Sequence, residues 1–312
     1  MLNLINFGDA KIGENIFYGG DAGAKDAIVY DGDVYMLKYP KSTRDLINPQ
    51  ISYTTSPLSE YLGSEIFKLL GIPVHKTLLG IKNNKVVVAC KDFTYNGTTL
   101  NSRLVPFNEL KNSFMASDLE SYSGTGSDTL LQEVLDTIEG QTTLQQLPGA
   151  KERFWDMFVT DAFIGNTDRN NGNWGILIDL KTGKTSLAPV YDNGNAFYNK
   201  KSLASMKTNL SDEKALQGDA YLSPLCTYKY KGLDNEGHRI NPFKYIKARD
   251  NADCTKAVAR FVEAVNMTAI EDLINNIPEN TGNLAVMPAI QKEYYLKLMH
   301  LRLNDIFIPT AD

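Results

Sequence analysis

The sequence predicts an α+β fold with two lobes, a β-rich lobe over residues 1–93 and a larger helical lobe over residues 94–312. Three observations predict it. Two apolar stretches in the first ninety residues each break at a short polar turn, as β-hairpins do. Helical periodicity dominates the last sixty residues. A Gly/Ser/Thr-rich stretch, SYSGTGSDT, lies between the two patterns. At 312 residues and 43% hydrophobic content, the chain is long and apolar enough for a sizeable core.

The first lobe reads as strands, one helix, and strands again. AIVYDGDVYMLKYP holds two apolar runs around a turn at residues 31–33, and KTLLGIKNNKVVVACKDF repeats this pattern around residues 83–84. Between them, SPLSEYLGSEIFKLLGIPV has helical spacing that begins after a Ser-Pro pair and ends at Gly71. Its apolar face comprises Leu58, Leu62, Ile66 and either Leu69 or Leu70.

The second lobe is predicted to be mainly helical. Two helical patterns precede a polar segment in the middle of the chain, and three follow near the end. We expect these helices over residues 128–140, 151–165, 254–265, 268–277 and 285–307.

Charge and cysteine content narrow the class of protein. The net charge of −5 and pI of about 5.4 argue against nucleic acid or an anionic membrane as the main partner, because both attract a basic face. Three scattered cysteines form neither a disulfide framework nor a zinc motif. With no signal peptide and no apolar run of membrane-spanning length, we expect a cytoplasmic protein, with export by a signal-independent route left open.

The densest chemical signal is IGNTDRNNGNWGILIDLKTGKTSLAPVYDNGNAF, residues 164–197. Two polar loops, residues 168–173 and 192–194, flank two apolar runs joined at residues 181–184, which read as a β-hairpin. A hairpin returns the chain close to its starting point. We therefore expect the two loops to lie side by side, with their carboxylates directed into a common space.

The residue types in these loops suit phosphoryl transfer. That reaction needs a carboxylate to orient the acceptor hydroxyl, and oxygen ligands for Mg²⁺ on the phosphates. Asp168 and Asn173 have the D-x-x-x-x-N spacing of a kinase catalytic loop, and Asp192, with Gly194 behind it, stands where a second metal ligand belongs. Either loop by itself would indicate only a turn. Both loops joined by a hairpin favour the catalytic interpretation.

Lys38 and Glu60 are the candidate residues for phosphate binding in the first lobe. Lys38 stands among apolar neighbours in the strand VYMLKYP, where its charge is costly unless an anion meets it. Glu60, early in the predicted helix, is the expected partner, and Glu65 is the competing candidate. The alternatives are a snorkelling edge-strand lysine and an acidic residue favoured by the helix dipole.

A glycine-rich stretch, YGGDAGAK, precedes the Lys38 strand. The backbone N–H groups of Gly19, Gly20 and Gly23 could wrap phosphates. The spacing does not match G-x-G-x-x-G, so a simple turn explains these glycines equally well.

GNTDRNNGNW followed by LAPVYDNG resembles the HipA-like protein kinases, in particular their short cell-translocating (CtkA-type) branch. YGG, YMLKYP, SEYLGSEIF and VVVACKDF occur in the same order as in that branch, so the resemblance covers residues 17 to 200. It implies a bilobal protein-kinase-like fold, ATP and Mg²⁺ as cofactors, and transfer to serine or threonine of a protein substrate, often with autophosphorylation.

Carried over by position, the resemblance makes Asp168 the catalytic base and Asn173 and Asp192 the metal ligands, with Lys38 on the phosphates and paired to Glu60. The implied hinge, which holds adenine through backbone hydrogen bonds, comprises Ala89, Cys90, Lys91, Asp92 and Phe93. One position departs from the family pattern, because Asn170 replaces a histidine usual two residues after the catalytic aspartate.

Two other functions stay open. The same loops are similar to those of type II phosphatidylinositol 4-kinases, although no cysteine cluster is present and the net charge disfavours anionic lipid. A nucleotide-binding pseudokinase that acts as an interaction protein is the third hypothesis. Arg169 could steady a phosphate or pair with a nearby carboxylate. Asp161 is expected to brace or to face solvent, and His75 has no evident partner.

Overall fold

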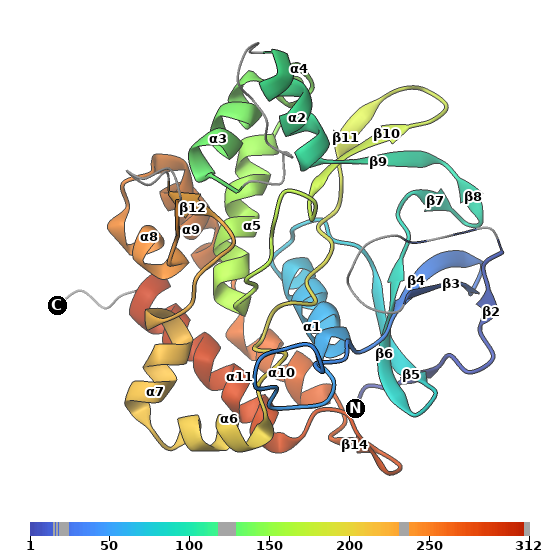
Figure 1. Cartoon of the computed structure of the whole chain (residues 1–312), viewed down its shortest axis with the longest axis vertical. Coiled ribbons are helices and arrows are strands. Elements are labelled where there is room, and N and C mark those ends of the chain that lie inside the picture. The colour runs from blue at the N-terminus through green and yellow to red at the C-terminus, as the bar shows by residue number, and fades with distance from the viewer. Residues whose placement is uncertain (15, 17, 19–24, 118–128, 231–236, 309–312) are drawn as a thin grey trace.

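A computed structural model describes residues 1–14, 16, 18, 25–117, 129–230 and 237–308. Figure 1 shows the sheet of strands β1–β6 on one side, most helices on the other, and helix α1 between them. The α+β prediction is therefore confirmed, with a β-rich front and a helical back.

The strands are β1 Ile5–Asn6, β2 Lys11–Ile12, β3 Lys25–Tyr30, β4 Asp33–Lys38, β5 Thr77–Lys82, β6 Lys85–Lys91, β7 Tyr95–Asn96, β8 Thr99–Leu100, β9 Ser102–Pro106, β10 Gly175–Asp179, β11 Thr185–Leu187, β12 Lys229–Tyr230, β13 His238–Arg239, β14 Asn280–Thr281 and β15 Leu284–Ala285. The helices are α1 Ser56–Leu69, α2 Phe107–Ser117, α3 Leu131–Gly140, α4 Thr142–Gln145, α5 Ala150–Ile164, α6 Leu203–Leu210, α7 Glu213–Gln217, α8 Pro242–Ala248, α9 Ala252–Ala264, α10 Met267–Asn276 and α11 Ala289–Arg302. Two π-helical turns, η1 Gly218–Leu222 and η2 Leu303–Phe307, continue α7 and α11.

The front sheet has the strand order β1-β5-β6-β4-β3-β2, with β1 parallel to β5 and the other pairs antiparallel. Both predicted hairpins are confirmed. Asp31 and Gly32 have φ angles of 47° and 79°, and Asn83 and Asn84 have 51° and 54°. Two central residues with positive φ match the right-handed twist of the flanking strands, and Asn, Asp and Gly adopt that conformation most readily.

Helix α1 lies against the inner face of this sheet, as its periodicity predicts. Leu58, Leu62 and Ile66 are each at most 2% exposed. Of the two candidates for the last turn, Leu70 packs against the core while Leu69 is exposed. The helix ends before Gly71, whose φ of 73° suits a residue without a Cβ atom.

The predicted catalytic hairpin forms as β10 and β11, and a third strand that the sequence did not reveal, β9, pairs with β10. Gly175 is required at this junction, because a Cβ atom there would stand 2.2 Å from the carbonyl oxygen of Val105. This pairing joins the hairpin to β9, in the segment that leaves the front sheet, and so determines where the loops at the two ends of the hairpin lie.

Helix α5 is the centre of the helical part and is buried on nearly every side. Trp155 stacks on Tyr245 with a centroid distance of 5.8 Å, and α9 packs along the same helix. The last predicted helix is too long at its beginning. Residues 284–285 pair in a small hairpin and α11 begins only after Pro288, because proline favours a helix start.

Most of SYSGTGSDT lies outside the described residues. Among the described helices, none is both long and apolar enough to cross a membrane.

Candidate active site

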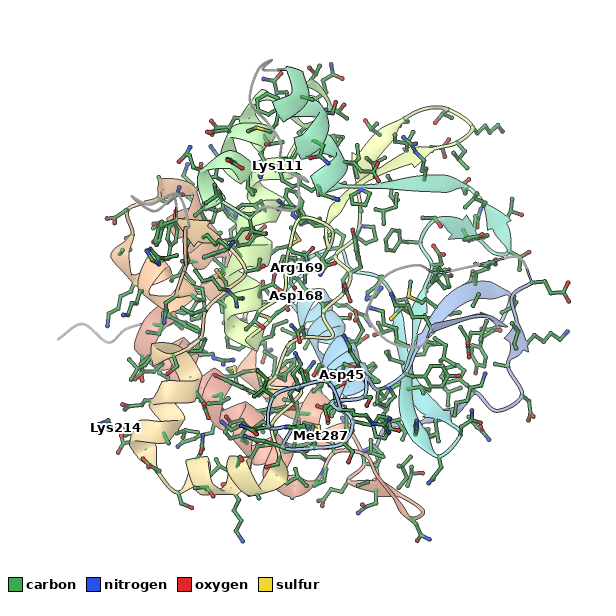
Figure 2. The ribbon with its side chains drawn as sticks, in the orientation of Figure 1. Asp45, Lys111, Asp168, Arg169, Lys214 and Met287 are labelled. Atoms are coloured by element: carbon green, nitrogen blue, oxygen red, sulfur yellow. The ribbon has the colours of Figure 1, made fainter. Side chains whose placement is uncertain are left out.

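A cleft of about 840 Å³ lies between the β-rich front and the helical back. Figure 2 shows Asp168 and Arg169 at the middle of the molecule, between α1 and α5. The sequence-predicted residues that line this cleft are Lys38, Glu60, Cys90, Lys91, Asp92, Phe93, Asp168, Asn173 and Asp192. The polar loops at the two ends of the β10–β11 hairpin therefore open into one space, as the sequence predicts.

Lys38, at the end of β4, holds two carboxylates together. Its Nζ lies 2.8 Å from Glu60 Oε2 and 2.9 Å from Asp192 Oδ1. Burial alone would lower the pKa of Lys38, but the two carboxylates raise it well above its ordinary value, so the ammonium is charged. The competing candidate Glu65 pairs instead with Lys68 at 3.2 Å, one turn along α1.

Glu60 is fully buried, and its hydrogen-bond partners stabilise its charge. His75 Nε2 lies 3.0 Å from Glu60 Oε1, and the backbone N–H of Asn193 donates to the same oxygen at 2.9 Å. Burial raises the pKa of a carboxyl group, yet Lys38 and His75 lower that of Glu60 well below its ordinary value. This role of His75 could not be predicted from the sequence, because its partners Glu60 and Ser64 lie 15 and 11 residues away along the chain.

Cys90 lies close to this pair, and one ligand atom from each of Glu60, His75 and Cys90 falls within 4.8 Å of the others. Such a trio resembles a metal site. However, the Lys38 ammonium already occupies Glu60 and opposes a second cation there, and burial raises the pKa of the Cys90 thiol well above its ordinary value. We therefore interpret the trio as support for the Lys38–Glu60 pair.

Asp168 follows the end of α5, where Gly165 at φ 70° ends the helix. Its side chain is exposed to the cleft. The Asn173 side-chain amide donates to the Asp168 carbonyl oxygen at 2.7 Å, which closes the loop. Asn170, which replaces the histidine of the family pattern, donates to Asp168 Oδ1 at 3.1 Å.

Arg169 points away from the cleft and joins the two loops from behind. Its guanidinium donates to the Asp161 carboxylate, at 2.8 Å from Nε, and to the carbonyl oxygens of Asn173 and Tyr191. A further bond goes to Asn193 Oδ1. Of the two roles considered for Arg169, pairing with a nearby carboxylate is the one observed, and Asp161 is a buried bracing residue. Burial opposes the charge of Arg169, but Asp161 raises its pKa above the ordinary value.

The backbone of Asp192 adopts a left-handed conformation, with φ of 61°, which is uncommon outside glycine. The bonds from Arg169 to Tyr191 and from Asn193 to Glu60 hold the residues on both sides of it. Helix α1 also approaches closely here, since a Cβ atom on Gly63 would stand 2.7 Å from that of Asn193. The conformation of this loop thus depends on α1, α5 and β4 together.

The predicted hinge falls at the end of β6, a central strand paired with both β4 and β5. The backbone groups of Ala89 and Cys90 face these neighbours, and the N–H groups of Lys91 and Asp92 donate to Lys76 and Val34. The N–H group of Phe93 donates to no other group in the described part of the chain, so it is available for a hydrogen bond to a ligand.

The region around the hinge carries two aromatic rings, those of Phe93 and Tyr191, which are tilted by 43° to each other. Their centroids are 5.6 Å apart, and both residues line the cleft. Asp92 accepts a hydrogen bond from the Tyr18 hydroxyl at 2.8 Å. The predicted phosphate-binding glycines, Gly19, Gly20 and Gly23, lie outside the described residues.

A β-rich front, a helical back and this arrangement of lysine, glutamate and paired acidic loops define the class of bilobal kinases. The sequence matches the family described as HipA-like C-terminal domain over residues 22–270, and the chain belongs to this family.

A curated relative and a solved structure, both named CtkA, come from Helicobacter pylori. The serine/threonine-protein kinase CtkA of Helicobacter pylori strain J99 is 33% identical over 302 residues, covering 97% of this chain and 86% of the relative. The crystal structure of a Helicobacter pylori proinflammatory kinase CtkA matches with a TM-score of 0.83 at 30% identity, over 98% of this chain and 96% of the other. The chain is accordingly an enzyme of the kinase class.

A more distant likeness shows the fold alone. HipA of Shewanella oneidensis MR-1, solved with HipB and operator DNA, matches with a TM-score of 0.50 at 12% identity. The match covers 92% of this chain and 66% of that one.

Proposed function

We propose that this enzyme transfers the γ-phosphoryl group of ATP, with Mg²⁺, to serine or threonine hydroxyls of a protein. The observation that carries the proposal is the meeting of Asp168, Asn173 and Asp192 in one cleft with Lys38 paired to Glu60. The relationship to CtkA, named a serine/threonine-protein kinase, supports the choice of acceptor over a lipid.

Asp168 is suited to the role of general base. Its exposed carboxylate can accept the proton of an acceptor hydroxyl while Asn170 holds Oδ1 at 3.1 Å. The acceptor oxygen then bonds to the γ-phosphorus, the bond from that phosphorus to the β–γ bridging oxygen breaks, and ADP leaves. Because Asp168 sits on a loop closed by Asn173, its carboxylate is positioned before substrate arrives.

The phosphates need cations, and Lys38 supplies one. A lysine ammonium has three N–H donors. Glu60 and Asp192 accept two of them, so the third is left for a phosphate oxygen. Glu60 thus acts as a positioning residue. Phe93 and Tyr191 together with Met36 and Leu104 give the same cleft an aromatic and apolar end that suits adenine.

The donor set fits Mg²⁺, which prefers hard oxygen ligands. The Asp192 carboxylate is one-third exposed to the cleft. The Asn173 amide nitrogen donates to the Asp168 carbonyl, so its Oδ1 is the end left for a cation. When bound, the metal neutralises phosphate charge during transfer.

Two finer expectations belong to the same proposal. We place the division between the lobes at residues 93 and 94, directly after the last central strand of the front sheet. We also propose autophosphorylation, with the segment after Asp192 as the region to search. Of its hydroxyl residues, Thr208 and Ser205 lie on α6, Ser211 follows that helix and Ser202 caps it.

The test is phosphoryl transfer from radiolabelled ATP to a general protein acceptor and, separately, to phosphatidylinositol vesicles. We expect Mg²⁺-dependent labelling of serine and threonine in the protein, and its loss in Asp168→Ala, which should still bind ATP. Asp272→Ala, an exposed aspartate on α10, is the matched control. Labelling of lipid alone would identify a lipid kinase. ATP binding without transfer by the unmodified enzyme would identify a pseudokinase.

A further inference from the structure

We infer that Lys41 and Lys200 recognise an acidic side chain next to the acceptor hydroxyl, so that the preferred substrate is an acidic serine- or threonine-containing segment. This inference rests on the proposed function, because it concerns the acceptor side of the same cleft. Neither residue was singled out by the sequence.

The first observation is that these two ammonium groups are unused. Five lysines line the cleft. Lys38 is paired with Glu60 and Asp192, Lys91 pairs with Asp33 at 2.6 Å, and Lys25 is engaged by another group. Lys41 and Lys200 are exposed, and neither has an ion-pair partner in the part of the chain that the structure describes.

The second observation is that the two lysines flank one junction. The backbone N–H of Thr54 donates to the Lys41 carbonyl at 2.9 Å, and that of Thr55 donates to the Asn199 carbonyl at 2.8 Å. Lys41 is therefore bonded to Thr54, and the next residue, Thr55, is bonded to Asn199, the residue before Lys200. Figure 1 shows this loop between β4 and α1 next to the chain that leads into α6.

The third observation places this junction beside the proposed base. The Asn195 side chain lies 3.5 Å from the hydroxyl of Thr167, the residue before Asp168. The Asn199 amide donates back to the carbonyl of Gly194 and lies 3.4 Å from Asn195 Oδ1. The segment that follows the metal-ligand candidate Asp192 is thus folded against the catalytic loop, and Lys200 stands at its end.

Tyr35 of β4 pairs with Lys91, next to Phe93, whereas Lys38 pairs with Val88, so Lys41 follows the end of β4 that lies opposite to Phe93, where adenine is placed. The phosphates already have Lys38. Two unpaired cations beside the acceptor position favour an anion on the acceptor, because a charge-assisted contact forms there without displacing an existing partner.

The test compares two peptides that differ only in having Glu or Gln on both sides of one serine. Binding is measured on Asp168→Ala with a non-hydrolysable ATP analogue, and kcat/KM on the active enzyme. We expect the active enzyme to prefer the Glu peptide by about tenfold, and each of Lys41→Ala and Lys200→Ala to lower this preference about threefold, as expected for exposed charge pairs. Lys214→Ala on α7, which Figure 2 shows far from Asp168, is the matched control.

A charge-reversed enzyme gives the sharper result. Lys41→Glu combined with Lys200→Glu should bind a peptide with Lys on both sides of the serine better than the Glu peptide. Because the comparison is a ratio within one variant, partial loss of folded protein does not alter it. Raising the salt concentration should reduce the Glu preference of the unmodified enzyme.

The outcomes separate this inference from the proposed function. Lysine-dependent binding of the Glu peptide without any transfer would leave the recognition site standing and remove the kinase assignment. Transfer with equal kcat/KM for Glu and Gln peptides would leave the kinase and overturn the inference. A rise in the KM for ATP in the lysine variants, or lysine-dependent phosphorylation of phosphatidylinositol vesicles only, would overturn it as well.

Discussion

Replacing Arg169 should separate the stability of this protein from its activity. Arg169 is 2% exposed and joins Asp161 to both polar loops. Arg169→Met leaves the Asp161 carboxylate buried with only Asn166 as a donor, and removes the donors of two carbonyl groups. Breaking a buried ion pair from one side costs about 3–5 kcal/mol. For 312 residues the entropy of unfolding is about 0.65 kcal/mol/K, so Tm should fall by about 6 °C.

The double variant Arg169→Met with Asp161→Asn isolates the charge. It removes the unpaired carboxylate but keeps the oxygen that Asn166 bonds, so about half of the lost stability should return. Activity should not return, because the carbonyl groups of Asn173 and Tyr191 and the side chain of Asn193 still lack their common donor. Displacing the loops by about 1 Å would lower kcat about 100-fold.

Thermal unfolding by circular dichroism and steady-state transfer assays on both variants measure these effects. Arg260→Met is the matched control. Arg260 also pairs with an aspartate on α5, but it is 38% exposed and lies outside the cleft, so its loss should cost about 1 kcal/mol or less. A double variant that regains both stability and kcat would show that Arg169 only neutralises Asp161 and does not position the loops.

Four further predictions concern other residues of the protein. Gly63→Ala should destabilise the fold by about 1–3 kcal/mol in urea unfolding, because its Cβ would stand 2.7 Å from that of Asn193, whereas helix propensity alone predicts about 1 kcal/mol of stabilisation. Asp168→Asn should lower kcat by about 100-fold or more with little change in the ATP dissociation constant, and unchanged kcat would remove Asp168 as the base. The three cysteines are buried, and burial raises the pKa of Cys226 and Cys254 to about 12, so iodoacetamide at pH 8 should label them only after unfolding. Both thiols are harder to ionise in the folded protein than in the unfolded chain, so their ionisation at high pH favours unfolding. Their contribution to the free energy of unfolding should therefore be intact below pH ~8.5 and decrease as the pH rises toward 12. Urea titrations at pH 8 and 10 would detect this decrease.

Local sequence patterns predicted the turns of the front hairpins and the helix α1 correctly, because turn chemistry and helical period depend on residues close together in the chain. The Asp31–Gly32 and Asn83–Asn84 turns carry their own backbone preference, and the leucines of α1 carry its period. The same patterns could not show that β9 pairs with β10, since that register depends on a contact across about seventy residues. They also extended the last helix over residues 285–288, because periodicity does not register a neighbouring hairpin.

The residues of the site divide in the same way, into those that a local sequence pattern predicts and those that only tertiary contacts reveal. The sequence predicts that Asp168, Asn173 and Asp192 share one site, because their spacing and the hairpin between the loops belong to one segment of the chain, and all three line the same cleft. Lys38 was found because a lysine among apolar strand residues needs an anion. His75, Ser64 and Asn193 were missed, because each acts on Glu60 or on the others only when distant parts of the chain meet.

The sequence by itself determined which residue types could carry phosphoryl transfer and roughly where the strands and helices begin, because hydrophobic period and turn chemistry are local properties. Only the tertiary structure decided which carboxylate Lys38 meets and that Arg169 braces the loops from behind. It also placed Lys41 and Lys200 in the lining of the cleft, without an ion-pair partner among the described residues. These are questions of which charges are brought within bonding distance once α1, β4 and α5 pack together. Charge interactions fall off with separation in space and not along the chain, so no pattern in the sequence encodes them.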